Sequence, residues 1–258
     1  IIAMMAIIPI FGTSLGGILS DIVGWQGSFF MLAITGLVLA IFVRTQIQET
    51  HQPEYVFTFK DALMGYRELL ATDRFIASAL TTAFQTAVFF AMMGFIAYSF
   101  ERMSISPKEF GVWMATTSVG YVIGNLANKR LLKRYRIEII TFVGAIASLM
   151  CLLLMEIWHT TAPNSPMGLA IPMLLVGLSN GVIIANSIII ASSAIPRLRG
   201  SATGLVGAMQ MGAGGIAGTV AIWLGADQDT NVGILTLLVI SFCSLISAWW
   251  SSRLQQLQ

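Results

Sequence analysis

The stretch Ile8-Pro9-Ile10-Phe11-Gly12-Thr13-Ser14-Leu15-Gly16-Gly17-Ile18-Leu19 lies within an apolar run and contains one proline and three glycines. In a water-soluble helix both residue types are costly, because glycine loses backbone entropy and proline lacks the N–H that the helix needs. In a membrane helix, glycines four residues apart let a second helix backbone approach closely, and Pro9 bends the span. Two interpretations stay open, a general packing face of small residues or a specialised helix between two moving halves of the protein.

The composition places the chain among integral membrane proteins. Of its 258 residues, 56% are hydrophobic and 10% are charged, and the mean hydropathy is +0.82, whereas a soluble domain has about 25% charged residues. The net charge of +2 is small, and no basic helix or interleaving of aromatic and basic residues predicts a nucleic-acid partner. Cys151 and Cys243 lie in apolar runs without a CxxC motif, so neither a disulfide framework nor a metal site is expected.

Eight apolar segments have the length of about 20 residues that a membrane helix needs, which predicts an all-α polytopic membrane protein. The predicted spans are 1–21, 27–44, 75–99, 108–128, 137–157, 168–191, 202–224 and 232–251. The chain has no initiator Met and begins inside the first of these segments. We therefore expect it to be a fragment of a longer protein.

Basic residues are distributed unevenly over the connections between these spans. Of the 14 Lys and Arg residues, only Arg102 and Lys108 fall in one set of alternate connections, and the others fall in the opposite set or at the C-terminal end. Because Lys and Arg concentrate in cytoplasmic loops, this split predicts that segment 45–74 and the C-terminus are cytoplasmic.

Segment 45–74 is predicted to contain an amphipathic helix. Thr58 and Asp61 have the spacing of a capping box. The apolar residues that follow share one helical face; they are Phe59, Leu63, Tyr66 and Leu70. The helix either lies at the cytoplasmic membrane surface or packs on the protein itself.

A weak internal repeat links the first and the seventh predicted spans. Leu15-Gly16-Gly17-Ile18 is similar to Ala213-Gly214-Gly215-Ile216. Together with the long connection 45–74, this similarity suggests two homologous halves of six spans, the first of which is incomplete in this sequence.

These features resemble the major facilitator superfamily, whose fold has two six-helix halves joined by a long cytoplasmic loop. The segment 12–17 resembles the antiporter motif in the fifth helix of drug:proton antiporters, with Thr13 where proline is usual. The segment 24–30 resembles the opening of the sixth helix, with Gln26 where arginine is usual. The segment 200–212 resembles the start of the eleventh helix in multidrug exporters of the Bcr/CflA type. The segment 124–134 resembles the second copy of the family's basic cytoplasmic motif, with Asn128 where the first copy usually has aspartate.

The resemblance implies that the chain is helices five to twelve of a twelve-helix fold. Residues 1–44 would be the last two helices of the N-terminal half, 45–74 the cytoplasmic loop with its amphipathic helix, and 75–258 the C-terminal half. The implied function is proton-coupled multidrug efflux by alternating access in the bacterial cytoplasmic (inner) membrane, which gives antibiotic resistance. In this interpretation the antiporter motif packs helices at the interface between the halves, through Pro9, Gly12, Gly16 and Gly17.

Substrate-binding candidates are uncharged polar and aromatic side chains within the spans. Ser78, Thr82, Gln85, Phe89 and Met92 form a stripe at helical spacing on the span that would be helix seven, and Asn180 lies on helix ten. The resemblance implies that these two helices face the central cavity. Further candidates are Tyr121 with Asn125, and then Gln210 and Asn186. Such a set suits varied lipophilic compounds, although Gln85 and Asn180 would serve equally well to join neighbouring helices.

Ionisable residues within the spans are few. Asp21 and Glu156 lie near span ends, where solvation is the simpler interpretation, so we expect the proton-coupling acidic residue in the preceding helices. His51 and His159 are expected in loops.

The sequence also bears on enzyme activity, on partners and on alternative functions. Enzyme chemistry is not expected, because the sequence has no HExxH, GxSxG or Walker motif, and no cofactor or metal is expected. The predicted partners are lipophilic small molecules, protons and the lipid bilayer, with a monomer as the complete protein. The alternatives are a proton-coupled importer of a small metabolite and a non-transporting membrane scaffold.

Overall fold

The computed structural model describes residues 23–46, 59–105 and 107–254, and within these ranges every regular element is helical. The all-α fold class is therefore confirmed. The chain divides into two compact units, with the sequence boundary between Phe59 and Lys60. This boundary falls inside the predicted connection 45–74.

The described part of the first unit is the helix α2, Trp25–Gln46, which coincides with the predicted span 27–44. Gly24 precedes it with a φ of 81°, a left-handed conformation that favours glycine. The Gly27 N–H donates to the Gly24 carbonyl oxygen at 3.0 Å, which closes the turn into the helix. The Thr35 hydroxyl donates to the carbonyl oxygen one turn earlier at 2.8 Å, so this polar group is satisfied within the helix.

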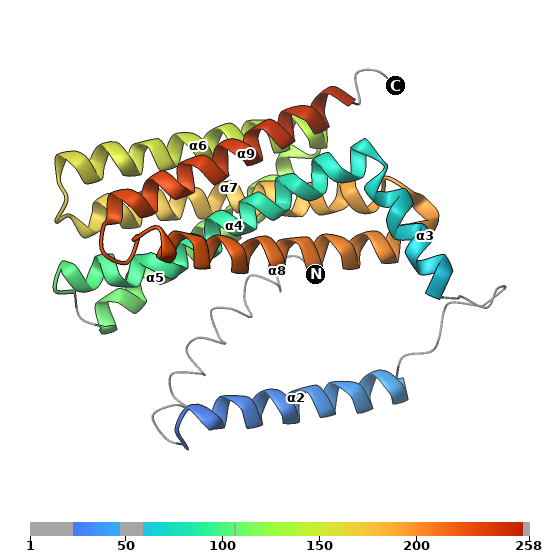
Figure 1. Cartoon of the computed structure of the whole chain (residues 1–258), viewed down its shortest axis with the longest axis horizontal. Coiled ribbons are helices and arrows are strands. Elements are labelled where there is room, and N and C mark those ends of the chain that lie inside the picture. The colour runs from blue at the N-terminus through green and yellow to red at the C-terminus, as the bar shows by residue number, and fades with distance from the viewer. Residues whose placement is uncertain (1–22, 47–58, 106, 255–258) are drawn as a thin grey trace. The chain divides into compact units, whose positions relative to one another are not determined.

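The second unit is a bundle of six long helices (Figure 1). They are α4 Asp73–Arg102, α5 Pro107–Leu131, α6 Ile137–Thr161, α7 Pro166–Ser192, α8 Arg199–Trp223 and α9 Thr230–Leu254. A shorter helix, α3 Phe59–Leu70, precedes them, and the 3-10 turn η1, Pro196–Leu198, leads into α8.

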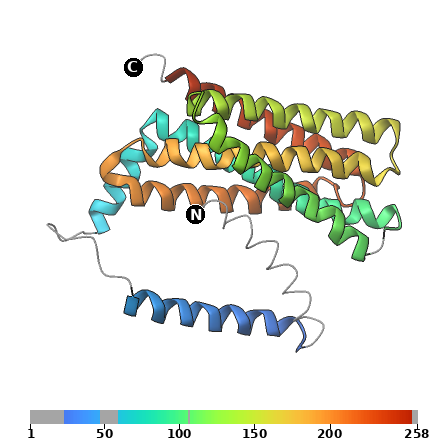
Figure 2. The same cartoon turned by 180° about the vertical axis from the view of Figure 1, so that it is seen from behind.

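Two helices, α4 and α7, form the centre of this bundle. The helix α4 packs against α8 and α9, α7 packs against α5 and α6, and α4 and α7 also contact each other. Figures 1 and 2 show the bundle from opposite sides. Two three-helix groups, α4–α6 and α7–α9, are thus interleaved, because each central helix packs on the outer helices of the other group. Repeats of three helices are a known construction in polytopic membrane proteins.

Six of the described helices are long and apolar enough to cross a membrane by length and composition, namely α2, α4, α6, α7, α8 and α9. The predicted helix 108–128 is present as α5, but its middle is rich in Thr, Gly and Asn and is less apolar than its neighbours. It packs along α7, where polar and small residues meet another helix. The predicted span 1–21 lies outside the described residues.

Buried polar side chains and the main apolar core lie at different heights along the helix axes of the bundle. The largest core cluster includes Phe95 and Phe100 of α4, Met155 of α6 and Met173 of α7. These residues belong to the level near the C-terminal end of α4. The other level contains most of the buried hydroxyl and amide groups that α4 contributes, from Ser78 to Thr86.

The helix α3 leaves part of its predicted apolar face exposed. Leu63, Tyr66 and Leu70 are 61%, 39% and 51% exposed, as a helix at a membrane surface requires. The capping residue Thr58 lies outside the described residues.

A different side of α3 packs on the bundle. Leu69 is fully buried in a cluster with Phe75 and Leu198, and Glu68 accepts a hydrogen bond from Arg197. The helix is thus held by the protein and still presents apolar side chains outward. Its location at the cytoplasmic membrane surface stays a prediction.

Candidate functional site

The polar stripe predicted on α4 is divided between neighbouring helices. The hydroxyl oxygens of Ser78 and Ser251 of α9 lie 2.9 Å apart, and Gln85 donates from Nε2 to Ser148 Oγ of α6 at 2.5 Å. Met92 is fully buried in the apolar core. These three predicted residues thus lie inside the bundle, where the two polar ones join α4 to α6 and α9. Their assignment to a substrate remains a prediction.

Thr82, from the same stripe, contacts α8 instead. Gln210 of α8 donates from Nε2 to the hydroxyl oxygen of Thr82 at 3.1 Å and to that of Thr86 at 2.9 Å. We call these three residues the α4–α8 seam. The structure thus brings together two residues that the sequence singled out separately, Thr82 and Gln210.

The α4–α8 seam leaves one hydrogen-bonding group of Gln210 available. An amide has two N–H donors and a carbonyl oxygen, and both bonds to the threonines are made by Nε2. No bond of Oε1 to another described residue accompanies them, so Oε1 is the remaining acceptor of this half-buried side chain. Thr86 was not predicted, although its position four residues after Thr82 places both hydroxyls on one helical face.

Phe89 is half-buried at the edge of the apolar core. Its ring meets that of Phe90 edge to face, with the centroids 5.7 Å apart and the planes at 85°. This T-shaped arrangement is favourable for aromatic pairs. The pair provides an aromatic surface one turn beyond Thr86 on α4.

The candidates on α5 and α7 have different surroundings. Tyr121 and Asn125 are half-buried, and Asn125 Nδ2 donates to the Tyr121 carbonyl oxygen at 3.0 Å. Asn180 is 2% exposed, and its Oδ1 has no hydrogen-bond partner among the described residues. Asn186 and Asn128 form a buried reciprocal pair, with Nδ2 to Oδ1 distances of 2.8 and 3.0 Å. This pair joins α5 to α7.

The helices α5 and α7 touch backbone to backbone at four glycines. These glycines are Gly120 and Gly124 of α5 and Gly177 and Gly181 of α7. A Cβ atom on any of them would overlap a carbonyl oxygen of the facing helix. We call these glycines and the Asn128–Asn186 pair the α5–α7 seam. The four-residue spacing of each glycine pair is a sequence signal for close packing of membrane helices, but it does not reveal which helix faces which.

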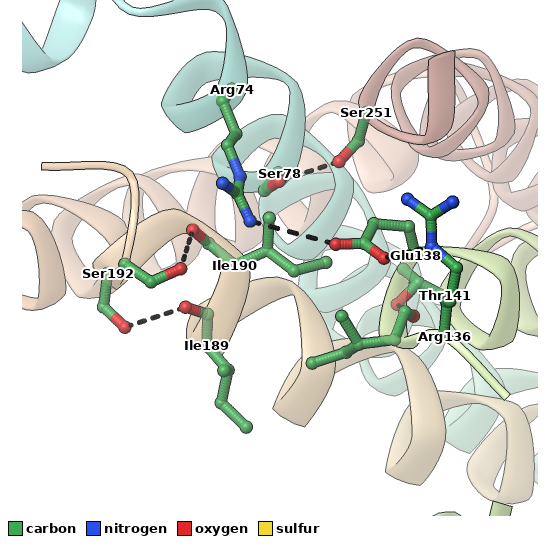
Figure 3. A network of polar contacts seen from close by, with 11 residues as sticks. Arg74, Ser78, Arg136, Glu138, Thr141, Ile189, Ile190, Ser192 and Ser251 are labelled. Atoms are coloured by element: carbon green, nitrogen blue, oxygen red, sulfur yellow. Dashed lines mark hydrogen bonds and ion pairs between the residues drawn. The ribbon is translucent and has the colours of Figure 1, made fainter. Parts of the chain in front are cut away.

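A buried carboxylate lies where α4 and α6 begin (Figure 3). Glu138 Oε1 is 3.9 Å from the Arg74 guanidinium, and Glu138 Oε2 is 3.9 Å from that of Arg136. Because the Glu138 side chain is only 5% exposed, it depends on these cations for charge compensation. The network ties the start of α6 to the start of α4, beside the Ser78–Ser251 contact.

A second polar network closes the opposite end of the bundle. Arg102 donates to the Asp227 carbonyl oxygen, to Thr230 Oγ1 at 2.7 Å and to Ser99 Oγ at 3.3 Å. Thr230 Oγ1 also donates to Ser99 Oγ at 2.8 Å. Arg102 thereby links the end of α4 to the connection between α8 and α9.

His159 corrects one expectation from the sequence. It lies in the last turn of α6 and is buried, so its predicted loop position is wrong. The hydropathy pattern ends the predicted span at 157, because His and Thr residues lower the local hydropathy, but the helix continues to Thr161.

The antiporter-motif candidates cannot be placed by this structure. Pro9, Gly12, Gly16 and Gly17 lie outside the described residues, as do Asp21 and His51. Their roles remain predictions from the sequence.

Comparison with known proteins identifies the family. The sequence matches no curated protein. The family model of the Major Facilitator Superfamily matches residues 1–219, which is most of the chain. With its bundle of apolar helices and this match, the chain belongs to the Major Facilitator Superfamily, whose members are membrane transporters.

Proposed function

We propose that this transporter exports lipophilic compounds in exchange for protons across a bacterial cytoplasmic membrane. Membership of the superfamily gives membrane transport. Export and proton exchange are supported by the resemblance of segment 12–17 to the antiporter motif of drug:proton antiporters.

The chemistry of the α4–α8 seam carries the proposal for lipophilic substrates. Its accessible group is the Gln210 amide, held by two hydroxyls, and the Phe89–Phe90 pair lies on the same helix, α4. These groups are uncharged, whereas the Arg74–Glu138–Arg136 and Arg102 networks lie at the helix ends. An aromatic and amide surface favours apolar ligands with a few hydrogen-bonding groups over sugars or amino acids.

The burial of the candidates divides their proposed roles. Half-buried Phe89, Tyr121 and Gln210 are proposed to contact the substrate, because ligand binding requires surface that another molecule can reach. Fully buried Gln85 and Met92 are proposed to hold α4 in place behind this surface. Substrate would be exchanged between the two sides by alternating access around a site near the middle of the membrane.

The test is dye accumulation in bacterial cells that lack their own exporters, with the protein expressed from its complete gene. Ethidium serves as the lipophilic cationic probe, and its fluorescence is followed with and without a protonophore. We expect less dye in these cells than in vector controls, and we expect the protonophore to abolish the difference. A difference that persists with the protonophore would contradict proton coupling, and greater accumulation than in the controls would indicate import.

The variant Gly16→Leu tests the antiporter motif. A leucine side chain at this position would block the close helix approach that the glycine is proposed to permit. We expect ethidium export to be lost while the amount of protein in the membrane, measured with a fluorescent fusion, stays the same. Normal export by this variant would rule out the proposed role of the motif.

A further inference from the structure

A groove with a volume of about 700 Å³ lies between α8 and α9, with α4 as its floor. Its lining includes Phe84 and Ala87 of α4, Ile216 and Val220 of α8, and Leu235 and Val239 of α9. The volume falls within the range of roughly 300–1,000 Å³ that is usual for ligand pockets. The groove exists because α8 and α9 both pack on α4 and make little contact with each other.

The lining of the groove offers hydrocarbon and no available hydrogen bond from a side chain. Among the described residues that line the groove, Thr236 alone has a polar side chain, and its hydroxyl already donates to the Val232 carbonyl oxygen of the same helix at 2.8 Å. A polar ligand would lose hydration here without gaining new partners, which is unfavourable. The chemistry of the groove therefore selects an apolar chain.

The length of the groove matches one leaflet of a bilayer. Along α8 the lining runs from Ala213 to Leu224, which corresponds to about 16 Å at a rise of 1.5 Å per residue. The hydrocarbon core of a bilayer is about 30 Å thick, so this length is close to half of it. The groove ends at the connection between α8 and α9, where the helices reach one edge of the membrane.

The groove opens onto an apolar surface that follows α9 along its length. This surface consists of residues that are 48% to 65% exposed and lie at spacings of four and three; they are Leu235, Val239, Phe242, Ile246 and Trp249. Trp249 lies near one membrane edge, with the Arg253 guanidinium 5.6 Å from its ring centroid. Trp223, 82% exposed, ends α8 at the other edge. Tryptophans at both ends are typical of a surface that faces lipid.

We propose that this groove binds one acyl chain of a membrane phospholipid, in the leaflet nearer to the α8–α9 connection. The apolar lining, the leaflet length and the continuity with the lipid-facing surface of α9 all favour this occupant over a polar molecule. The proposal concerns a surface outside the α4–α8 seam and is independent of the direction of transport.

The first test is photochemical labelling of the native protein, expressed from its complete gene and reconstituted in nanodiscs. The probe is phosphatidylethanolamine with a diazirine in its acyl chain, and labelled residues are mapped by peptide mass spectrometry. We expect stronger labelling of Ile216, Val220 and Val239 than of Ile246, which is exposed but lies outside the groove lining. Equal labelling of all four residues would overturn the proposal. Labelling of Ile246 without the groove residues would show that protein covers the groove, with the same consequence.

The second test fills the groove. Ala213→Phe adds a ring to its lining, whereas Ile246→Phe adds a ring to the open part of the α9 surface as a matched control. If the added ring displaces two methylene groups of the acyl chain from the groove, retention of the lipid should fall roughly tenfold. Retention is measured by native mass spectrometry as the lipid that stays bound after detergent washing. Unchanged retention in a folded Ala213→Phe protein would contradict the proposal. Displacement of the diazirine lipid from the native protein by ethidium would identify the groove as a substrate site and overturn the assignment to lipid.

Discussion

The α5–α7 seam and the α4–α8 seam occupy equivalent places in the two three-helix groups, yet they are built differently. In the α5–α7 seam four glycines bring backbones into direct contact, and Asn128 and Asn186 complete each other's hydrogen bonds. In the α4–α8 seam side chains make the contact, since Gln210 reaches to Thr82 and Thr86. The first seam therefore has no room for a ligand or a shift, whereas the second keeps a half-buried amide, which we propose as a contact for the substrate.

The glycines of the α5–α7 seam should show the largest effect on stability. A Cβ atom at Gly124 would overlap the Leu178 carbonyl oxygen, so Gly124→Ala forces the two helices apart. We expect a loss of about 3 kcal/mol in the free energy of unfolding, the upper end of the usual cost of overpacking. Thermal unfolding of the purified protein in detergent measures this loss as a lower midpoint.

Two glycines of α8 provide matched controls for Gly124→Ala. Gly212 has no atom within 4 Å of an added Cβ, so Gly212→Ala should be neutral or stabilise the helix by up to about 1 kcal/mol. A Cβ at Gly214 would lie 2.6 Å from the Phe90 ring, which can rotate, so Gly214→Ala should fall between the other two variants. Equal unfolding midpoints for Gly124→Ala, Gly212→Ala and Gly214→Ala would contradict the proposed difference between the two seams.

The Asn128–Asn186 pair should show a strong coupling. Replacing either residue by alanine leaves the other amide buried without its partner, which costs about 1–3 kcal/mol. The double variant should therefore lose less than the sum of the two single variants. A double-mutant cycle by thermal unfolding measures this coupling, and additive losses would show that the two amides do not depend on each other.

Gln210→Ala should lower stability less than Gly124→Ala and should have a clear effect on transport. We expect Gln210→Ala to lose about 1–3 kcal/mol, because it leaves the buried hydroxyls of Thr82 and Thr86 without their hydrogen-bond partner. We also expect it to raise the ethidium concentration needed for half-maximal export. Thr219→Ala is the matched control on α8, since the Thr219 hydroxyl is exposed and bonds only within its own helix. Unchanged export by Gln210→Ala would place the binding surface elsewhere.

The extent of the helices follows closely from the sequence, because hydropathy and helix-start signals are local properties. The helix α5 begins at Pro107, a residue favoured at the first helical position, and α3 begins at Phe59, next to the predicted capping residue. His159 shows the limit of this reasoning, because a helix continues past its apolar segment when its last turn is buried.

The candidate site was less accessible to prediction, because it depends on which helix lies beside which. The stripe from Ser78 to Met92 occupies one side of α4 by spacing, but α6 and α9 meet one edge of it and α8 meets the other. A rotation of a few tens of degrees thus decides whether a side chain joins the core or a seam. Glu138 illustrates the same limit, since only the folded bundle brings Arg74 to it.

The interleaved helices also have a consequence for biosynthesis. The partners of α4 on one side are α8 and α9, and α8 begins at Arg199, roughly 100 residues after α4 ends. At about 5–20 residues per second, the ribosome needs about 5–20 s to supply it. During that interval α4 lacks Gln210 as the partner of Thr82 and Thr86, so these hydroxyls must bond to carbonyl oxygens one turn earlier in α4 or to transient partners. Among the six helices of the bundle, the order of synthesis thus makes α4 the one that waits longest for its native partners.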